Sequence, residues 1–399
     1  MSEKLWEKGY KVNELVEKFT VGEDYQTDMK LISYDIEASL VHAEMLKKMG
    51  YLTDEEFEKI KKGLEKLSKL LKTGEFAIKP EDEDSHTAIE NFLISEIGET
   101  GKKIHTARSR NDQILTALRL FYKSKLKNIE NLIRRLQNRV RKFSEKYGNV
   151  EFAAFTHTRK AMSTTFKTWC YALIDALDDD LKLLKTTYEI IDQSPLGTGA
   201  GYGIPIDIDR KFTAKKLGFS RIQHNPIYSQ NSRGKFDYLI IHSLSQISYD
   251  LNRFASDIIF FSIPDIGYLI IPRELCTGSS IMPHKLNPDP LELVRAYHHR
   301  IVSNLLECVM TSSNLISGYH RDFQLNKKKA IESFEIIEQI LVIMELVFEK
   351  LEVDERKCHA SLSEEVLSTR KVYELVKRGI PFRDAYKQIA TEFMRGEKN

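Results

Sequence analysis

The sequence has too few cysteines for a disulfide-stabilised fold and no apolar run long enough to cross a membrane. Its 399 residues include only four cysteines, with no Cys-x-x-Cys pair and no Cys/His cluster spaced for zinc. No stretch approaches the roughly 18 consecutive apolar residues of a membrane-spanning helix. Residues 1–14 lack the apolar core of a signal peptide. We therefore expect reduced thiols, a cytoplasmic location and no membrane partner.

An excess of charge of either sign is also missing. The chain carries 60 Lys and Arg residues against 58 Asp and Glu residues, a formal net charge of +2. Proteins that bind nucleic acid usually present a strongly basic surface, so this balance gives no reason to expect nucleic acid as a partner. The length is sufficient to bury a substantial core in two or three domains.

Glycine and proline are absent from four long stretches, residues 102–147, 149–194, 235–263 and 319–378. Strands average only about 5–6 residues and structureless loops of such length are rare, so we predict that these stretches are helical. Apolar residues within them recur at three- and four-residue spacing, as in Phe166, Leu173 and Leu177. In the last stretch the pattern pauses near Val353–Asp354, where we expect an interruption.

The predicted fold class is all-α. Four or five long antiparallel helices would form one bundle, whereas a doubly wound fold needs alternating strands that the sequence does not supply. We predict an N-terminal helical domain at 1–104, a central long-helix bundle at 105–350 and a small C-terminal helical domain at 351–399. Helices of this length tend to bury apolar residues on more than one side, which favours an oligomer.

The segment Gly278–Pro288, with the sequence GSSIMPHKLNP, concentrates polar groups of several kinds. The hydroxyls of Ser279 and Ser280, the ammonium of Lys285, the amide of Asn287 and free backbone N–H groups could together hold a carboxylate and stabilise extra negative charge on it. A turn that only caps the following helix would need one Ser or Asn. We therefore interpret this segment as part of a catalytic site.

This segment resembles the signature loop GSSxMPxKxNP of the fumarase/aspartase superfamily. Residues 105–113, HTARSRNDQ, are similar to HTGRSRNDQ of the argininosuccinate lyases, a family that includes the delta-crystallins; fumarases and adenylosuccinate lyases carry other residues there. Further similar segments, spread over roughly residues 19 to 390, are 82–88 (DEDSHTA), 156–162 (THTRKAM), 194–200 (SPLGTGA), 319–324 (YHRDFQ) and 379–383 (GIPFR).

The resemblance implies a cofactor-free and metal-free homotetramer in which each active site combines residues of three subunits. The implied reaction is the β-elimination of argininosuccinate to arginine and fumarate, through a carbanion stabilised at its carboxylate. In the roles that follow, Ser279 is the base, Lys285 and Asn287 stabilise the carbanion, and His157, oriented by Glu292, is the acid; the exchange of base and acid stays open. The remaining expected contacts with substrate are His86, Ser109, Arg110, Asn111, Thr156, Ser280, Tyr319, Gln324 and Lys327.

The sequence also departs from the family pattern. Asp24 stands where the family usually has a substrate-binding Ser, and that role is not transferred to it. Residues 229–236, SQNSRGKF, replace a stretch that usually ends in SDRDF. Arg159 and Met162 depart in the segment that contains His157. Lys327–Lys329 has the composition of an exposed basic run, in which only Lys327 inherits a binding role.

Two alternative functions are left open. The first is another fumarate-releasing lyase such as an adenylosuccinate lyase, against which the HTARSRND and YHRDFQ segments argue. The second is a non-enzymatic structural protein of the delta-crystallin kind. The presence of Ser279, Lys285, Asn287 and His157 together argues against that alternative, although a structural protein can keep such residues.

Overall fold

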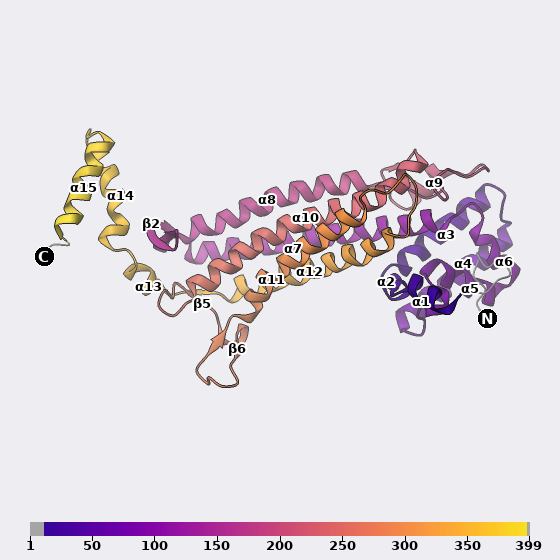
Figure 1. Ribbon diagram of the computed structural model, residues 1–399, viewed down its shortest axis with the longest axis horizontal. Coiled ribbons are helices and arrows are strands. Elements are labelled where there is room, and N and C mark those ends of the chain that lie inside the picture. Colours follow the sequence, from indigo (N-terminus) through magenta and orange to yellow (C-terminus); the bar gives the residue numbers. More distant parts are fainter. Residues whose placement is uncertain (1–11, 397–399) are drawn as a thin grey trace. The chain divides into compact units, whose positions relative to one another are not determined.

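The computed structural model describes residues 12–396, most of them in α-helices (Figure 1). The expectation that the chain has no signal peptide concerns residues 1–11, which lie outside the described residues, as do the outer ends of the two predicted terminal domains. The strands are few and short, and they occur in two-stranded pairs. The predicted all-α class is confirmed. Within the described residues no helix is long and apolar enough to span a membrane.

The helices are α1 (Glu14–Val21), α2 (Asp24–Asp28), α3 (Ile32–Lys48), α4 (Asp54–Thr73), α5 (Ser85–Ile97), α6 (Glu99–Lys102), α7 (Arg110–Tyr147), α8 (Phe166–Ile191), α9 (Arg210–Lys216), α10 (Pro226–Phe261), α11 (Asp289–Thr311), α12 (Phe323–Lys350), α13 (Glu355–Ala360), α14 (Glu364–Lys377) and α15 (Phe382–Gly396). The strands are β1 (Glu151–Thr156), β2 (Arg159–Thr165), β3 (Gln193–Ser194), β4 (Arg221–Ile222), β5 (Leu269–Ile270), β6 (Thr277–Gly278), β7 (Leu286–Asn287) and β8 (Glu352–Val353).

The long helices α7, α8, α10, α11 and α12 have 38, 26, 36, 23 and 28 residues. Four of them, α7, α8, α10 and α12, lie largely in the four stretches named above, and α11 lies largely in a fifth stretch without glycine or proline, residues 291–317. The interruption expected near Val353–Asp354 is also present, because α12 ends at Lys350 and the short strand β8 follows.

Residues 151–165 are a β-hairpin, so the prediction that all of 149–194 is helical is wrong there. Strand β1 pairs antiparallel with β2, and Phe152 and Ala153 are buried. Phe and Thr, which favour strands, are frequent in this segment. His157 and Thr158 form the turn with φ of 51° and 57°, the left-handed conformation that two-residue hairpin turns require. Glycine usually supplies that conformation, and its absence concealed the turn in the sequence.

The chain divides into two compact units, each described here by itself. Unit 1 comprises the residues up to 129 together with 183–244 and 302–335, and unit 2 comprises 130–182, 245–301 and the residues from 336 onward. Each of the five long helices contributes residues to both units. The division into 1–104, 105–350 and 351–399 stays a prediction.

Unit 1 has a core among α3, α4 and α5 and a second among segments of the long helices. The first contains the buried side chains of Leu46, Leu64 and Leu93. In the second, the Tyr122 hydroxyl on α7 donates to Asp237 on α10 at 2.7 Å. The ring of Tyr122 also stacks on Phe334 of α12, with ring centroids 5.8 Å apart. These contacts fix the start of α7, which carries several expected site residues.

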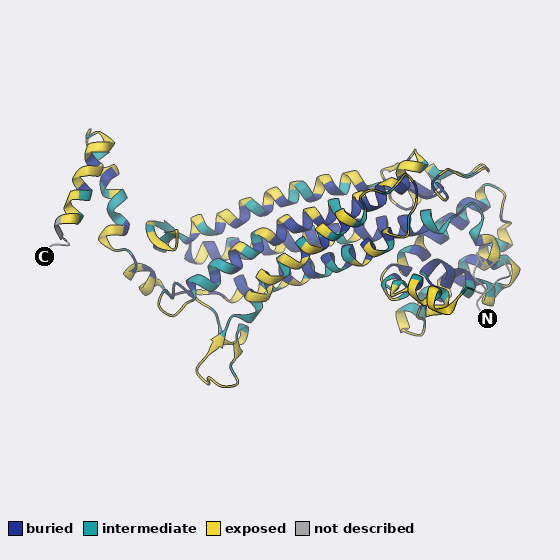
Figure 2. Cartoon of the chain, in the orientation of Figure 1, coloured by how far each residue is buried: buried dark blue, intermediate teal, exposed yellow. Residues whose placement is uncertain are grey.

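Unit 2 is held by aromatic side chains of its long-helix segments. The ring of Trp169 on α8 lies 5.3 Å from Phe254 on α10 and 5.8 Å from Phe348 on α12, centroid to centroid. The Ala153 amide donates to the Ser361 hydroxyl at 2.9 Å, which anchors the β1–β2 hairpin. Figure 2 shows the buried residues of the long helices on the faces that they turn toward neighbouring helices.

Candidate active site

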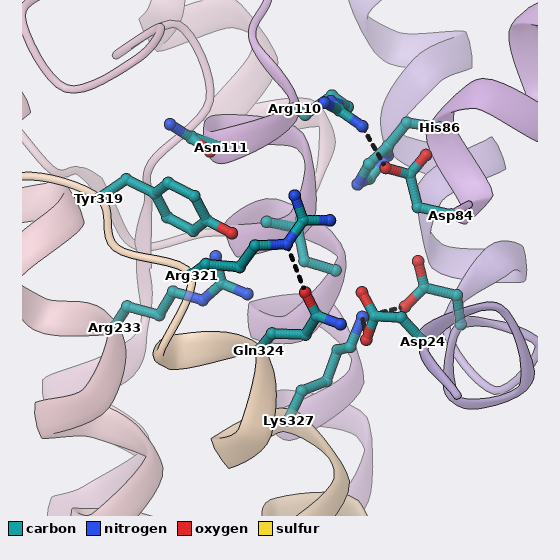
Figure 3. Close-up of a pocket in the computed structure, with 12 residues that line it drawn as sticks. Asp24, Asp84, His86, Arg110, Asn111, Arg233, Tyr319, Arg321, Gln324 and Lys327 are labelled. Atoms are coloured by element: carbon teal, nitrogen blue, oxygen red, sulfur yellow. Dashed lines mark hydrogen bonds and ion pairs between the residues drawn. The ribbon is translucent and has the colours of Figure 1, made fainter. Parts of the chain in front are cut away.

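A cavity in unit 1 brings together six of the side chains expected at the active site (Figure 3). It is small, about 100 Å³, and polar. The expected residues are His86, Arg110, Asn111, Tyr319, Gln324 and Lys327, and the other lining residues are Asp24, Asp28, Asp84, Ile114, Arg233 and Arg321. They come from α2, α5, α7, α10, α12 and the segments before α5 and α12. Positive and negative side chains therefore line one cavity.

Lys327 is only 2% exposed, which corrects the expectation of an exposed basic run. The reason is that its ammonium lies 2.7 Å from Asp24 and 2.5 Å from Asp28. Burial alone would lower the pKa of Lys327, but the two carboxylates outweigh it and raise that pKa. Burial also raises the pKa of Asp24, in spite of the opposing effect of Lys327. Lys327 is therefore a charged group held between two carboxylates.

His86 is positioned by Asp35, a buried residue that sequence reasoning missed. The imidazole Nδ1 lies 2.5 Å from Oδ2 of Asp35, which also accepts a hydrogen bond from the Ser85 hydroxyl at 2.9 Å. Burial would lower the pKa of His86, but Asp35 and the neighbouring carboxylates outweigh it and raise that pKa. The other nitrogen, Nε2, is buried and has no hydrogen-bond partner among the described residues. An imidazolium here can donate its Nε2–H to a substrate oxygen.

Arg110 and Asn111 lie in the first turn of α7, at the cavity. A guanidinium nitrogen of Arg110 lies 2.9 Å from Glu83 and 3.2 Å from Asp84. The backbone amide of Asn111 donates to the Ser109 hydroxyl at 3.3 Å, so Ser109 supports this turn without lining the cavity. The start of a helix carries unpaired N–H groups and a partial positive charge, which suit a substrate carboxylate.

Asp112 ties the start of α7 to the segment 194–200. Its buried carboxylate accepts hydrogen bonds from the backbone amides of Ser109, Gly197 and Gly199, each at 2.9 Å. Burial raises the pKa of Asp112 to about 6 in spite of these bonds. The two glycines have φ of 85° and 60°, a conformation that favours glycine. Two of the segments that resemble the family are thus joined by one carboxylate.

The signature segment lies in unit 2 as a second hairpin. Strand β6 pairs with β7, and the connecting residues form an exposed loop (Figure 1). The Ser279 hydroxyl oxygen accepts hydrogen bonds from the backbone amides of Ile281 at 3.3 Å and Met282 at 3.1 Å. Backbone N–H groups directed at one oxygen stabilise negative charge on it. Ser280 is the next residue of the loop and is exposed.

Lys285, Asn287 and Glu292 line a second cavity, of about 870 Å³, within unit 2. Glu292 lies in the first turn of α11. Lys285 is exposed and forms no ion pair within residues 12–396. This lysine can therefore approach an anionic substrate without first breaking an internal pair.

Thr156 and His157 lie at the turn of the β1–β2 hairpin, where both are exposed. Figure 1 shows this hairpin and the β6–β7 hairpin at separate places in unit 2. In the described part of the chain no hydrogen bond or ion pair joins His157 to Glu292, so that pairing stays a prediction. The expected residues therefore form three groups: the unit 1 cavity, the signature hairpin with Glu292, and the Thr156–His157 turn.

Six charged residues at or near the unit 1 cavity were not predicted as site residues: Asp24, Asp28, Asp35, Asp84, Arg233 and Arg321. Arg321 belongs to the YHRDFQ segment and could have been found from it. The guanidinium of Arg233 lies over the ring of Tyr319 at 5.2 Å, and this arginine falls in the stretch already noted as a departure. The sequence gives no signal for Asp28 and Asp35, because their importance comes from burial beside Lys327 and His86.

Comparisons with known proteins agree on one group of enzymes. The sequence matches the protein family described as Lyase over residues 7–303. It is 66% identical over 395 residues to a protein of Thermotoga neapolitana named argininosuccinate lyase, covering 99% of each chain. It is 35% identical over 397 residues to an argininosuccinate lyase of Phocaeicola vulgatus, covering 100% of this chain and 89% of that one.

Similar solved structures include EDDS lyase, with a TM-score of 0.83 and 21% identity, covering 98% of this chain and 77% of that chain. A class II fumarase from Schistosoma mansoni has a TM-score of 0.78 and 15% identity, with coverage of 94% and 91%. At these identities the likeness concerns the fold alone. It agrees with the predicted fumarase/aspartase-like architecture.

Proposed function

Because the chain belongs to the argininosuccinate lyase family, we propose that it cleaves argininosuccinate into arginine and fumarate by β-elimination. The observation that carries this proposal is the 66% identity over 99% of both chains to a relative of that name. The unit 1 cavity supports it, because six expected substrate contacts line one polar space. Neither a different fumarate-releasing lyase nor a crystallin-like structural role is favoured by the comparisons.

The proposed reaction begins with removal of a proton from the carbon next to a substrate carboxylate. The C–H electron pair then forms a carbanion whose charge is delocalised onto that carboxylate. Since carbon acids are weak, stabilisation of this dianion dominates the barrier. The Lys285 ammonium, the Asn287 amide and backbone N–H groups of the signature loop supply it. The carbanion then expels the nitrogen of arginine, which takes up a proton as the C–N bond breaks.

We assign the proton acceptor to Ser279 and the proton donor to His157, oriented by Glu292. A Ser hydroxyl is normally too weak a base and needs a neighbouring positive environment. The two amides directed at its oxygen and the nearby Lys285 support this role. Closure of the exposed 279–285 loop over the substrate would expel water and strengthen each of these interactions.

The remaining roles concern substrate binding. Arg110, Asn111 and His86 would hold a carboxylate of the succinyl half, with Ser109 supporting the turn. Tyr319, Gln324 and Lys327 would surround the arginine half. Thr156 and Ser280 would contact substrate from their own hairpins. No metal or organic cofactor takes part in these roles.

We further propose a cytoplasmic homotetramer whose active sites combine the three groups from different subunits. A test mixes two inactive variants, Arg110→Ala and Ser279→Ala, under conditions that exchange subunits. Suppose that each site takes Arg110 from one subunit and Ser279 from another. In an equal mixture each of these two residues is then the natural one with probability one half. About a quarter of the sites have both, so about a quarter of the full activity returns. No recovery in mixed tetramers would overturn the shared site. Light scattering verifies the tetramer.

The reaction itself is tested by the ultraviolet absorbance of fumarate. The purified protein is supplied with argininosuccinate or with adenylosuccinate in parallel. We expect fumarate release from argininosuccinate only, with arginine formed in equal amount. Release from adenylosuccinate alone would assign the chain to the other lyase, and no release from either would favour a structural protein.

A further inference from the structure

The end of the unit 1 cavity at Lys327 carries more negative than positive charge. Lys327 is paired with two carboxylates, so the trio has a net charge of −1 when both are ionised. Asp28 is fully buried and also accepts the backbone amide of Ser85 at 3.0 Å. The Asp24 side chain is 20% exposed and lines the cavity. Of the two carboxylates, Asp24 is therefore the one that a ligand can reach.

An arginine without an ion pair lies beside this carboxylate. Arg233 is 4% exposed, and its Nε has no hydrogen-bond partner among the described residues. It forms no ion pair within residues 12–396, although it is near enough to Asp24 to act on its charge. A buried guanidinium without a paired anion is costly unless a ligand supplies one. Figure 3 shows Arg233 and Asp24 directed toward the same part of the cavity.

Both residues also fall at positions where the sequence departs from the family pattern. Asp24 replaces the usual Ser. If Ser232 and Phe236 are aligned with the first and last residues of SDRDF, Arg233 occupies the place of an Asp. The same alignment puts Gly234 in the place of the family's Arg, so the arginine is moved by one position, and the structure places Arg233 and Asp24 at one cavity.

Resting on the proposed function, we propose that Asp24 and Arg233 together determine specificity by receiving the α-ammonium and α-carboxylate of the arginine half of the substrate. These two substrate charges sit one carbon apart, so their receptor needs an anion and a cation side by side. The guanidinium end of the substrate carries the succinyl group, whose carboxylate is assigned above to Arg110, Asn111 and His86, so Asp24 and Arg233 are left for the amino-acid end.

The test compares three ligands on the full-length protein by calorimetry. L-Arginine carries both charges, 5-guanidinopentanoate lacks the α-ammonium, and agmatine lacks the α-carboxylate. We expect each analogue to bind the natural protein at least about tenfold more weakly than arginine. The penalty is the factor by which an analogue binds more weakly than arginine. In Asp24→Asn the penalty for 5-guanidinopentanoate, which lacks the ammonium, should shrink to about threefold or less. The penalty for agmatine, which lacks the carboxylate, should persist. In Arg233→Gln the reverse should hold.

Glu23→Gln is the matched control. Glu23 also pairs with a lysine of α12, Lys328, but on the exposed surface and outside the cavity. It should keep the natural penalties for both analogues. If Asp24→Asn or Arg233→Gln does not fold, Asp24→Ser and Arg233→Met, which also remove the charges, replace them. Unchanged penalties in both cavity variants would overturn the inference, as would the loss of both penalties in Glu23→Gln.

A second ligand pair separates this inference from the proposed function. L-Citrulline keeps the α-ammonium and α-carboxylate but lacks the guanidinium charge. If Asp24→Asn removes the preference for arginine over citrulline, Asp24 binds the guanidinium and the inference is wrong. Fumarate release from argininosuccinate is measured on the same samples. If the natural protein releases fumarate but Asp24→Asn does not change recognition of the ammonium, this inference alone is wrong. If the natural protein releases no fumarate, the proposed function is wrong.

Discussion

Nδ1 of His86 lies 2.5 Å from the carboxylate of Asp35, and both side chains are buried. Asp35 raises the pKa of His86 above its ordinary 6.5, although burial opposes this. His86 and Arg108 hold the pKa of Asp35 below its ordinary 3.8, again against burial. The pair therefore stabilises the fold as an ion pair. Its contribution is complete above about pH 3.8 and below pH 6.5; it is lost as the pH falls through the folded-state pKa of Asp35 or rises through that of His86.

Asp35→Asn should lower the free energy of unfolding by about 3–5 kcal/mol near pH 6, because it leaves His86 buried without its counterion. The loss should shrink toward pH 9, as the pH rises through the raised folded-state pKa of His86 and the imidazole loses its charge. Urea unfolding followed by circular dichroism, at one protein concentration and both pH values, measures this difference. Glu58→Gln, at an exposed position of α4, is the control. An equal loss at both pH values would mean that His86 is uncharged in the folded state.

Asp112→Asn should destabilise the protein by about 2–5 kcal/mol, because an amide group cannot accept all three of the backbone N–H bonds that the carboxylate accepts. In the variant the new NH₂ faces either the amide of Ser109 or the amides of Gly197 and Gly199, so at least one buried donor is left unsatisfied, which is costly. Thermal unfolding measures the loss. Asp54→Asn, at an exposed residue paired with Lys47, should change stability by less than about 0.5 kcal/mol. A similar small change in Asp112→Asn would contradict the bridging role.

The all-α class and four of the five long helices were predictable because a local property determines them. A long stretch without glycine or proline has little alternative to a helix, and tertiary contacts need not be known. The hairpin at 151–165 was missed because its turn uses His157 and Thr158 at positive φ. That turn forms only because β1 and β2 pair with each other. The absence of glycine and proline gives no information about such strand pairing.

The candidate site was predictable only where residues lie in long motifs. Arg110, Asn111 and Gln324 were found in this way, and the structure places them at one cavity. Asp35 was missed because it is important only as the buried partner of His86. Likewise, three consecutive lysines resemble a solvated surface, and nothing local reveals that Lys327 folds inward between two carboxylates.

Gly234→Ala should destabilise unit 1 by about 1–3 kcal/mol through overpacking. A methyl group at Gly234 on α10 would lie 2.1 Å from the Ser312 hydroxyl oxygen and 3.0 Å from the ring of Phe323. Adding Ser312→Gly removes the nearest atoms, so the double variant should recover part of the loss relative to the sum of the single changes. Chemical unfolding of all four proteins provides the cycle. If the two single changes add strictly, the close approach of Gly234 to Ser312 is not the cause of the destabilisation.

Ser279→Ala should lower kcat by roughly 10²–10⁴, the usual contribution of a general base. Substrate affinity should change little, because the hydroxyl acts mainly in the transition state and the contacts of Arg110 and Asn111 remain. Lys285→Ala should impair both kcat and affinity, since its charge serves the bound carboxylate and the dianion alike. Steady-state fumarate release measures these effects, with the tetramer of each variant verified by light scattering.

The assignment of base and acid is decided by hydrogen exchange. In D₂O, a base that abstracts the proton reversibly places deuterium in argininosuccinate that has not yet reacted, and mass spectrometry detects it. Ser279→Ala should abolish this exchange because no group remains to take the proton. His157→Asn should retain it while slowing release of arginine, because water can replace the acid only partly. If Ser279→Ala still exchanges and His157→Asn does not, the histidine at the β1–β2 turn is the base, and the two amides that donate to Ser279 serve the loop's conformation instead.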